Sequence, residues 1–252
     1  MRRRFVGRVV RRRYYKNCYN RPVATFTPDR LRVARVAAGF TQQQAAEHLG
    51  VSQAYLALME TGRRRVTEEI GLKMMDLYRL GPTVLPLHLD DLESWDSASL
   101  AAALANLGYP GFRHLSGGPR DNPAVVLLAA LSRRDVEVRV VEGLPWLAVE
   151  YYDLDWEWLM REAKVRDAQN RLGFIVTLGR RTAGKRGSDA AQRKLRQVEE
   201  RLDHARLARE DSLCQEFLSA AERGWLRRTR TADARRWKLL TDLDAEHLPY
   251  AA

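Results

Sequence analysis

Arginine and aromatic side chains are concentrated in the first 28 residues of the chain, where they could bind phosphate and stack on nucleobases. Residues 1–28 hold nine basic and no acidic residues, and Phe5, Tyr14, Tyr15 and Tyr19 lie among them. Guanidinium groups pair with phosphates, and aromatic rings stack on bases. Two interpretations stay open for this leader. It is either an arm that contacts DNA or an unstructured tail with incidental charge, the latter including a start codon placed too far upstream.

No recognisable catalytic or metal-binding motif appears in residues 97–252. The five histidines of the chain do not form a His-Glu-x-x-His pair. A Gly-Ser pair at 187–188 and an Asp-x-Asp at 242–244 are elements of nucleotidyltransferases, but they lie too far apart for that site. Cys18 and Cys214 are too few for a disulfide framework or a cysteine zinc site. We therefore predict a binding protein that is not an enzyme, with no catalytic residue, no cofactor and no metal.

Composition excludes two other classes of protein. With 45% hydrophobic residues, the 252-residue chain can form one large or two smaller domains. It has no apolar run near the 18 or so residues that a membrane span requires, so we predict no membrane partner. A polar stretch, Tyr15-Lys16-Asn17, follows the basic leader in place of an apolar core, which argues against a secretion signal. The expected location is the cytoplasm, in association with the nucleoid if the chain binds DNA.

Four short helices are predicted between residues 28 and 80. Each has a polar capping residue at its start, and glycine breaks the chain between several of them. Apolar residues recur at helical spacing, as at Leu31, Ala34, Val36 and Ala38 in the first helix. The first helix begins at Thr27-Pro28-Asp29 and runs to Gly39, the second covers 42–49 after Thr41, the third covers 53–59 after Ser52, and the fourth begins at Thr67 and is stopped by Gly81-Pro82.

The second and third helices form a helix-turn-helix around Gly50-Val51-Ser52. Glycine allows the tight turn, and alanines allow the two helices to cross closely. Over residues 28–80, about a fifth of the chain, the sequence resembles the lambda-repressor and Cro-like family, also called XRE-type. The residues that carry the resemblance are Leu31, Arg35, Gly39, Thr41, Gln42, Ala46, Leu49, Gly50, Val51, Ser52, Leu56, Glu60, Thr61, Gly62 and Arg63.

This resemblance implies a DNA-binding face. In the family, the third helix enters the major groove and the preceding helix anchors to the backbone. Gln42 is then a candidate phosphate contact, and Ser52, Gln53, Ala54 and Tyr55 are the residues that face the groove. Gln53 is the strongest candidate for base recognition, because an amide makes two hydrogen bonds to adenine.

Further candidate contacts flank this set. Gln43 is either a second backbone contact or exposed helix surface. Leu58 occupies a position where many relatives carry a polar residue, and it could touch only a thymine methyl, so we expect modest sequence specificity. Arg63, Arg64 and Arg65 are placed to hold phosphates, although a solvated charge run is the alternative.

Arg35 and Glu60 have a different role by the same resemblance. In the family, an arginine and a glutamate at these positions pair inside the domain. We therefore predict a structural ion pair between Arg35 and Glu60 and no contact of either with DNA.

A second, larger helical module is predicted at residues 97–252, after a proline-bearing, acidic linker at 81–96. Expected helix starts are Ser97, Asn122-Pro123, Asp135 and Asp155, and Pro145 should kink or end the helix that follows Asp135. Residues 169–178 would also suit a strand, but we expect a helix there, followed by a basic linker at 180–188.

A long polar helix is expected from Asp189 to Glu210. Five apolar residues follow one another there at alternating spacings of four and three, which makes a seam of about two heptads. Because confident coiled coils have three or four heptads, a helical hairpin within the chain is the favoured outcome, and this helix is also our candidate dimer contact. The seam consists of Ala191, Leu195, Val198, Leu202 and Ala205.

Together these features predict a mainly α protein that has a lambda-repressor-like helix-turn-helix bundle and a helical C-terminal module. The predicted function is sequence-specific binding of double-stranded DNA by a transcriptional regulator, with repression by promoter occupancy. One recognition helix offers few base contacts, so a homodimer on two half-sites about 34 Å apart should supply the missing affinity.

Two alternatives stay open. The chain could be an antitoxin that represses its own operon and binds a toxin through residues 97–252. It could also be a nucleic-acid-acting enzyme with an unrecognised site in the same region. Clustering of Asp153, Asp155, Glu157 and Glu162 around one cleft would favour the enzyme.

Overall fold

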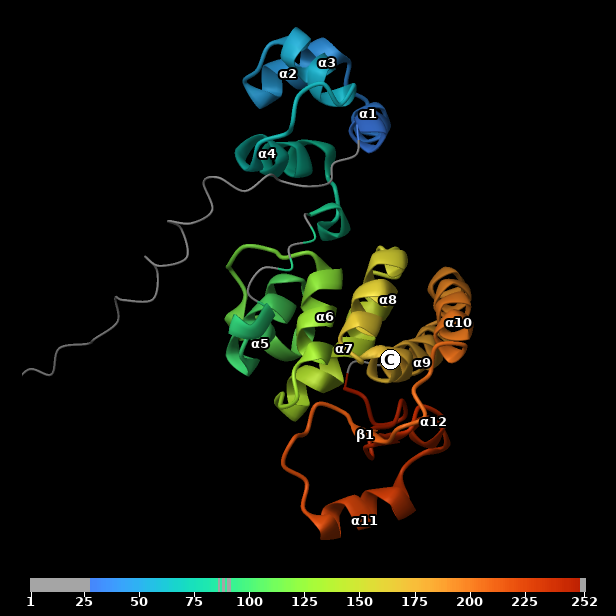
Figure 1. The fold of residues 1–252 in the computed structure, drawn as a ribbon. Coiled ribbons are helices and arrows are strands. Elements are labelled where there is room, and N and C mark those ends of the chain that lie inside the picture. The colour runs from blue at the N-terminus through green and yellow to red at the C-terminus, as the bar shows by residue number, and fades with distance from the viewer. Residues whose placement is uncertain (1–27, 86, 88, 90–91, 250–252) are drawn as a thin grey trace, which may run out of the picture. The chain divides into compact units, whose positions relative to one another are not determined.

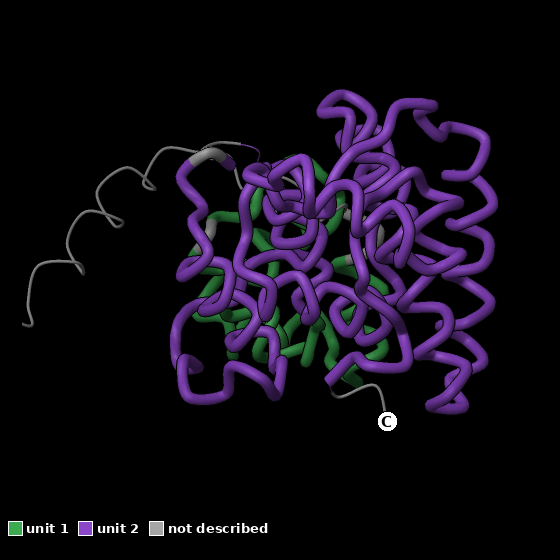
Figure 2. Tube along the Cα trace, turned by 90° about the horizontal axis from the view of Figure 1, so that it is seen from below, with its two compact units in different colours: residues 1–81 green, residues 82–252 purple. Residues whose placement is uncertain are grey.

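The chain forms two compact units, residues 1–81 and residues 82–252 (Figure 2). The computed structural model describes residues 28–85, 87, 89 and 92–249, so the predicted leader at 1–27 lies outside the described residues. Both units are built from helices, and the strands seen in the described residues are one short parallel pair, β1 (Asp211–Ser212) and β2 (Leu239–Leu240). The predicted, mainly helical fold is confirmed.

Four helices make up the described part of the first unit (Figure 1). Their starts follow the expected caps: the Thr41 hydroxyl accepts a hydrogen bond from the Gln44 amide, and the Ser52 hydroxyl accepts one from the Tyr55 amide. Gly50 has a φ of 70°, the left-handed conformation that glycine adopts most readily. The helices are α1 (Pro28–Ala37), α2 (Gln42–Leu49), α3 (Gln53–Glu60) and α4 (Glu68–Tyr78).

The core of this unit holds the four helices together. Leu31, Leu49, Leu56, Met59 and Met74 come from all four helices and are each at most 2% exposed. Helices this short are marginal in water, so their stability comes from this packing. The fourth helix ends at Tyr78, three residues before the predicted stop at Gly81. The residue after Tyr78, Arg79, has a left-handed backbone conformation with a φ of 52°.

Residues 82–96, expected to belong to a linker, are attached to the second unit where the structure describes them. They form two 3₁₀ helices, η3 (Pro82–Val84) and η4 (Leu92–Ser94), which pack against α6 (Pro123–Ser132). The Asn122 side-chain amide donates hydrogen bonds to the carbonyl oxygens of Thr83 and Leu85, at 3.2 and 2.6 Å. The observed segment is therefore not the separate linker that the sequence predicts, because its backbone carbonyl groups accept hydrogen bonds from the residue that precedes α6.

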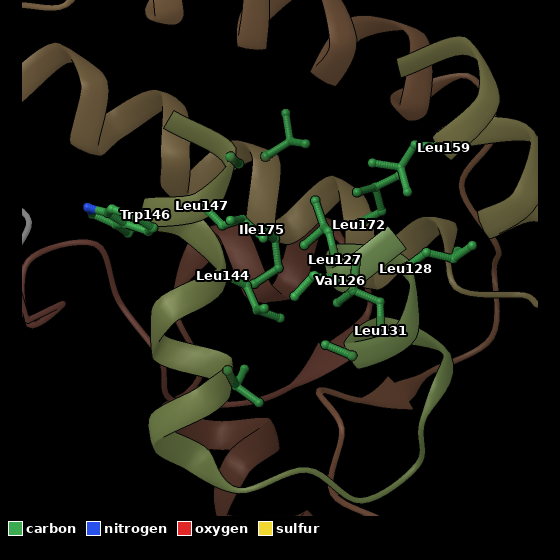
Figure 3. Packing of buried hydrophobic residues seen from close by; sticks show 14 of the residues in the cluster. Val126, Leu127, Leu128, Leu131, Leu144, Trp146, Leu147, Leu159, Leu172 and Ile175 are labelled. Atoms are coloured by element: carbon green, nitrogen blue, oxygen red, sulfur yellow. The ribbon is translucent and has the colours of Figure 1, made fainter. Parts of the chain in front are cut away.

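The second unit has its core among α6, α7 (Val138–Glu150), α8 (Trp156–Val165) and α9 (Gln169–Lys185). Figure 3 shows Leu127 of α6, Leu144 and Leu147 of α7 and Leu172 of α9 converging on one another. Helices α5 (Ser97–Asn106) and η5 (Pro110–Leu115) pack together, and α5 contacts α6 and α7. Asp96, and not the predicted Ser97, caps α5 by accepting a hydrogen bond from the Ser99 amide.

Two elements run further than the sequence indicates, because burial outweighs local preference. Helix α7 continues through Pro145, and every residue from 143 to 149 is buried. An interior proline costs about 3 kcal/mol, which is comparable with the gain from burying one or two large apolar side chains. Helix α9 likewise continues to Lys185, so the predicted linker at 180–188 is wrong over most of its length.

Helix α9 and α10 (Asp189–Asp203) form a hairpin, which confirms the expected packing within the chain. The seam residues Ala191, Leu195, Val198 and Leu202 are each at most 2% exposed, and α10 ends before Ala205. The helix ends seven residues earlier than predicted. Since α9 already covers this seam, its apolar side chains are not free to contact a second copy.

The C-terminal segment returns to α9 through Trp237, which is fully buried. Along the chain, Trp237 comes after two further helices, α11 (Ala220–Thr229) and α12 (Ala232–Arg236). The Trp237 indole donates a hydrogen bond to the Thr177 hydroxyl at 2.8 Å. Gly173 makes room for the ring, because a Cβ there would lie 2.2 Å from it.

Cys214 occupies a buried position in the second unit. It follows β1 outside any helix, is fully buried and has a φ of 56°. Burial raises the pKa of its thiol to about 12.

Among the helices of the described residues, none combines the length and the apolar character that a membrane span needs.

We expect Gly173→Ala to lower the free energy of unfolding of the second unit by about 1–3 kcal/mol, because the added methyl overlaps the Trp237 ring. Urea titration followed by tryptophan fluorescence measures this, since all six tryptophans lie in residues 82–252. Gly184→Ala in the same helix is the control. Its methyl meets only the end of the flexible Gln192 side chain, so stability should be equal or slightly greater. Equal stability of the two variants would contradict the packing argument.

Candidate nucleic-acid interface

The N-terminal end of α3 presents small and polar side chains to solvent. Ser52, Gln53 and Ala54 are exposed, whereas Leu56 and Met59 on the opposite side of α3 are buried in the core of the first unit. Tyr55 is half-buried and packs against that core. The structure thus brings three of the four predicted groove-facing residues to the surface, and it gives Tyr55 a partly structural position.

The exposed residues of α3 differ in what their side chains already bind. The Ser52 hydroxyl oxygen accepts the Tyr55 amide at 3.1 Å, which leaves its own proton free to donate. Gln53 makes no side-chain hydrogen bond within the described part of the chain. Its carboxamide can therefore donate and accept at once, which is what paired recognition of adenine requires.

A buried ion pair fixes α3 to α1, as predicted. Arg35 donates from Nε to one Glu60 oxygen at 2.6 Å, from Nη2 to the other at 3.2 Å, and from Nη1 to the Phe40 carbonyl at 2.8 Å. Arg35 and Glu60 are 7% and 6% exposed. The hydrogen bond to Glu60 raises the pKa of the Arg35 guanidinium above its ordinary value, against the opposing effect of burial.

Gln42, the predicted phosphate contact, is joined to the same carboxylate. Its Nε2 donates to Glu60 Oε2 at 2.9 Å, so Glu60 links α1, α2 and α3. This bond holds the Gln42 side chain at the start of α2 and leaves its amide oxygen and second N–H unassigned. Gln43 lies on the exposed side of the helix and donates a long hydrogen bond of 3.4 Å to Glu47.

An open hollow of about 500 Å³ lies beside the start of α2. Arg32 is exposed at this hollow, and the N-terminal N–H groups of α2 favour anions. The hollow could therefore admit a backbone phosphate. Sequence reasoning missed Arg32, although its spacing of three from Arg35 places both on one face of α1. The hollow is lined by Arg32, Arg35, Thr41, Gln42, Glu60 and Thr61.

The three arginines after α3 lie at the opposite end of this helix from Gln53. Arg63, Arg64 and Arg65 are exposed, and the Arg64 amide donates to the Leu58 carbonyl oxygen at 3.0 Å, which folds the loop back onto α3. An eight-residue helix is about 12 Å long, which is also the approximate width of the major groove. Leu58 is half-buried, so its side chain is only partly available to a base.

Gln44 takes part in a capping box with Thr41. Its side-chain oxygen accepts the Thr41 backbone amide at 3.0 Å, while Thr41 accepts the Gln44 amide. The Thr-x-x-Gln spacing is the sequence pattern that could have predicted this role. The box fixes the start of α2 next to the hollow.

The four acidic residues that would favour an enzyme are each held by a different group. Asp153 accepts from Thr83, and Asp155 caps α8 at the Trp158 amide. Glu157 pairs with Arg201, and Glu162 pairs with Arg166. Of the four, Glu157 alone lines the second unit's hollow of about 330 Å³. Within residues 28–85, 87, 89 and 92–249, no group of three histidine, cysteine or acidic side chains is placed to hold a metal ion.

Glu60→Ala should destabilise the first unit by about 3 kcal/mol or more, because it leaves the Arg35 guanidinium buried without its partner. Thermal unfolding followed by circular dichroism at helical wavelengths measures the effect. Glu69→Ala is the matched control, since Glu69 forms an exposed pair with Lys73 and its loss should leave the melting temperature nearly unchanged. If both variants melted like the wild type, the Glu60 carboxylate would not be holding the unit together.

Comparison with known proteins supports this site in one segment of the chain. A family model described as a helix-turn-helix domain matches residues 29–87, which covers the whole described part of the first unit after Pro28. No curated protein and no solved structure matches the chain. Over residues 29–87 the chain therefore contains a helix-turn-helix domain of the XRE/Cro-like type, the kind of domain that binds DNA.

Proposed function

We propose that this chain is a sequence-specific transcriptional repressor that occupies promoter DNA as a dimer. The observation that carries the proposal is the exposed N-terminal end of α3, where Gln53 has an uncommitted carboxamide in a helix-turn-helix domain. A side chain already bound within the protein would have to break that bond before it could bind a base. Gln53 has no such cost.

Backbone contacts would position this end of the helix in the groove. The hollow with Arg32 and Gln42 accepts one phosphate at the start of α2. The loop of Arg63, Arg64 and Arg65 reaches a phosphate beyond the other end of α3. Such contacts supply affinity and register but carry little sequence information.

Specificity from one copy is limited, which is the reason for the dimer. Gln53 is the one long polar side chain among the exposed residues at this end of α3, and half-buried Leu58 can touch only a methyl group. Each good paired base contact discriminates by about 1–3 kcal/mol, whereas a functional operator needs about 4–10 kcal/mol. Two copies on two half-sites double the number of base contacts.

Gln53→Ala should reduce the preference for the selected operator over a variant at one base pair by about 5- to 150-fold, the range expected for one paired contact. The operator is first obtained by selecting bound sequences from a random DNA pool. Binding of operator and variant is then compared by fluorescence anisotropy at one salt concentration. Gln43→Ala removes an exposed glutamine from α2 and should leave the preference intact. An unchanged preference in Gln53→Ala would refute base recognition by this residue.

Replacing Arg63, Arg64 and Arg65 with glutamine should weaken binding to all sequences and flatten its salt dependence. Each lost phosphate contact lowers the slope of log K against log salt by about 0.9, so the full effect is about 2.7. The control variant has glutamine in place of Lys73 and Arg79. Lys73 is exposed on α4, and Arg79 is exposed directly after it. A slope equal to that of the wild type would show that the three arginines form a solvated charge run.

A further inference from the structure

The end of the α9–α10 hairpin carries a dense run of basic residues. Residues 185–196 hold five basic residues and one acid, Asp189. The sequence indicates a basic linker at the start of this run, whereas the structure has the end of α9, a turn at Gly187 and the beginning of α10. These cations therefore lie on a helical scaffold and not on an irregular linker. They are Lys185, Arg186, Arg193, Lys194 and Arg196.

Two earlier arginines of the hairpin are neutralised within the second unit. Arg180 pairs with Glu199, and Arg181 pairs with Asp233 at 2.8 Å. These ion pairs join α9 to α10 and α12, so both arginines have a structural role. Neither could bind a further anion without weakening the pair that it already forms.

The cations at the end of the hairpin lack such acids. Lys185 donates to the carbonyl oxygen of Ala245 at 3.3 Å, and because this acceptor is neutral, the charge of Lys185 stays unbalanced. Three exposed residues of α10 form no side-chain hydrogen bond or ion pair within the described part of the chain, namely Arg193, Lys194 and Arg196. We call these three residues and Lys185 the hairpin cations. Asp189 lies in the first turn of α10, where the helix dipole stabilises a carboxylate, and it offsets one positive charge at most.

The hairpin cations lie close together because α9 and α10 pack against each other over their length. Gly184 of α9 lies against Gln192 of α10, since a Cβ on Gly184 would lie 2.6 Å from the amide nitrogen of Gln192. Arg193 and Arg196 are three residues apart on α10, so their guanidinium groups are neighbours that repel each other. Figure 1 shows α10 at one edge of the second unit. The result is a positively charged surface that a polyanion would stabilise.

We propose that the hairpin cations bind the phosphate backbone of the DNA that the first unit recognises. This inference rests on the proposed DNA binding of the chain and adds a second contact surface to it. Charge complementarity favours this partner, because duplex DNA carries one negative charge per about 1.7 Å of its axis. The helix-turn-helix domain of the same chain gives bound DNA a high effective concentration at the second unit, so weak phosphate contacts there add to the affinity.

The composition of the surface favours backbone contacts over base recognition. Residues 185–196 include no aromatic residue on which a base could stack, which argues against a site for single strands. Lysine and arginine contacts to phosphate carry no sequence information. The second unit should therefore raise the affinity for duplex DNA of any sequence and leave the choice of operator to α3.

Other basic surfaces of the second unit are less suitable. Residues 227–238 hold six basic residues and one acid, but half of these cations pair with acids, namely Arg227, Arg230 and Arg236. The remaining three are divided among α11, α12 and the turn that contains Lys238. Arg201, beside the hollow of the second unit, is held by Glu157. Only at the hairpin end do three uncommitted cations follow one another on one helix.

Replacing Arg193, Lys194 and Arg196 with glutamine tests the proposal in the full chain. Glutamine forms helices about as well as lysine and arginine, so α10 should stay folded, which circular dichroism checks. Binding to a random-sequence duplex is measured by fluorescence anisotropy over a range of salt concentrations. The slope of log K against log salt should fall by about 0.9 for each lost phosphate contact, or about 2.7 for all three. The preference for the selected operator over a one-base variant should not change.

The control variant has the same loss of charge elsewhere in the second unit. Glutamine replaces three exposed arginines that form no ion pair within the described residues, namely Arg113, Arg120 and Arg139. If the hairpin cations act by direct contact, this variant should keep the slope of the wild type. If net charge alone matters, both variants should lose the same amount.

Acetylation of lysines in the unaltered protein gives a second readout that requires no variant. Bound duplex should protect Lys185 and Lys194 from an amine-reactive acetylating reagent, as measured by mass spectrometry. Lys164 and Lys238 are exposed in the same unit and should stay reactive, so they serve as internal controls.

The inference is overturned if the hairpin variant has the slope of the wild type or of the control, or if Lys185 and Lys194 stay reactive in the complex. Such a result would leave the surface to another partner, for example an acidic protein. Failure of the repressor proposal gives a different result. If no operator can be selected while a random duplex still protects the two lysines, the hairpin contact holds and sequence-specific regulation does not. A chain that binds no DNA even at low salt contradicts both.

Discussion

The helix-turn-helix domain depends on the buried carboxylate of Glu60. This one group accepts hydrogen bonds from Arg35 of α1 and Gln42 of α2 and belongs to α3 itself. A buried carboxylate is tolerated only when its oxygens are satisfied, so the three helices are held in the arrangement that satisfies them. Together with the shared apolar core, this constraint holds α3, and with it the exposed end that carries Gln53, against α1 and α2.

The same carboxylate connects stability to recognition. By holding Gln42, it sets one wall of the hollow at the start of α2, where the capping box of Thr41 and Gln44 fixes the helix end. The exposed Arg32 lines the same hollow. The proposed phosphate site at the start of α2 and the base contact proposed for Gln53 therefore lie on helices that one buried network joins, whereas Arg63, Arg64 and Arg65 lie on the loop after α3.

The two units use their apolar residues differently. In the second unit, α6 is buried along almost its whole length, and α5, α7 and α8 pack against it. Leucines of α6, α7 and α9 meet in the same core (Figure 3). So complete a core leaves few apolar side chains for other contacts. Phe217, which precedes α11, and Trp225 on α11 are exceptions that stay exposed. Helix α11 itself is held to the unit by buried Leu226 and by the ion pairs of Arg227 and Arg230 with Glu210.

The sequence alone determined the features that depend on contacts within three or four residues. The caps at Thr41, Ser52, Asn122 and Asp155 are local hydrogen bonds, and the left-handed turn at Gly50 is a local backbone preference. The resemblance of residues 28–80 added the Arg35–Glu60 pair, which spacing could not reveal. Tertiary structure decided the features that local preference opposes or does not specify. The free energy gained by burying many apolar side chains exceeds the cost of one interior proline or one polar segment. Tertiary structure carried α7 through Pro145 and α9 through residues 180–185, covered the α10 seam, and left Trp225 of α11 exposed.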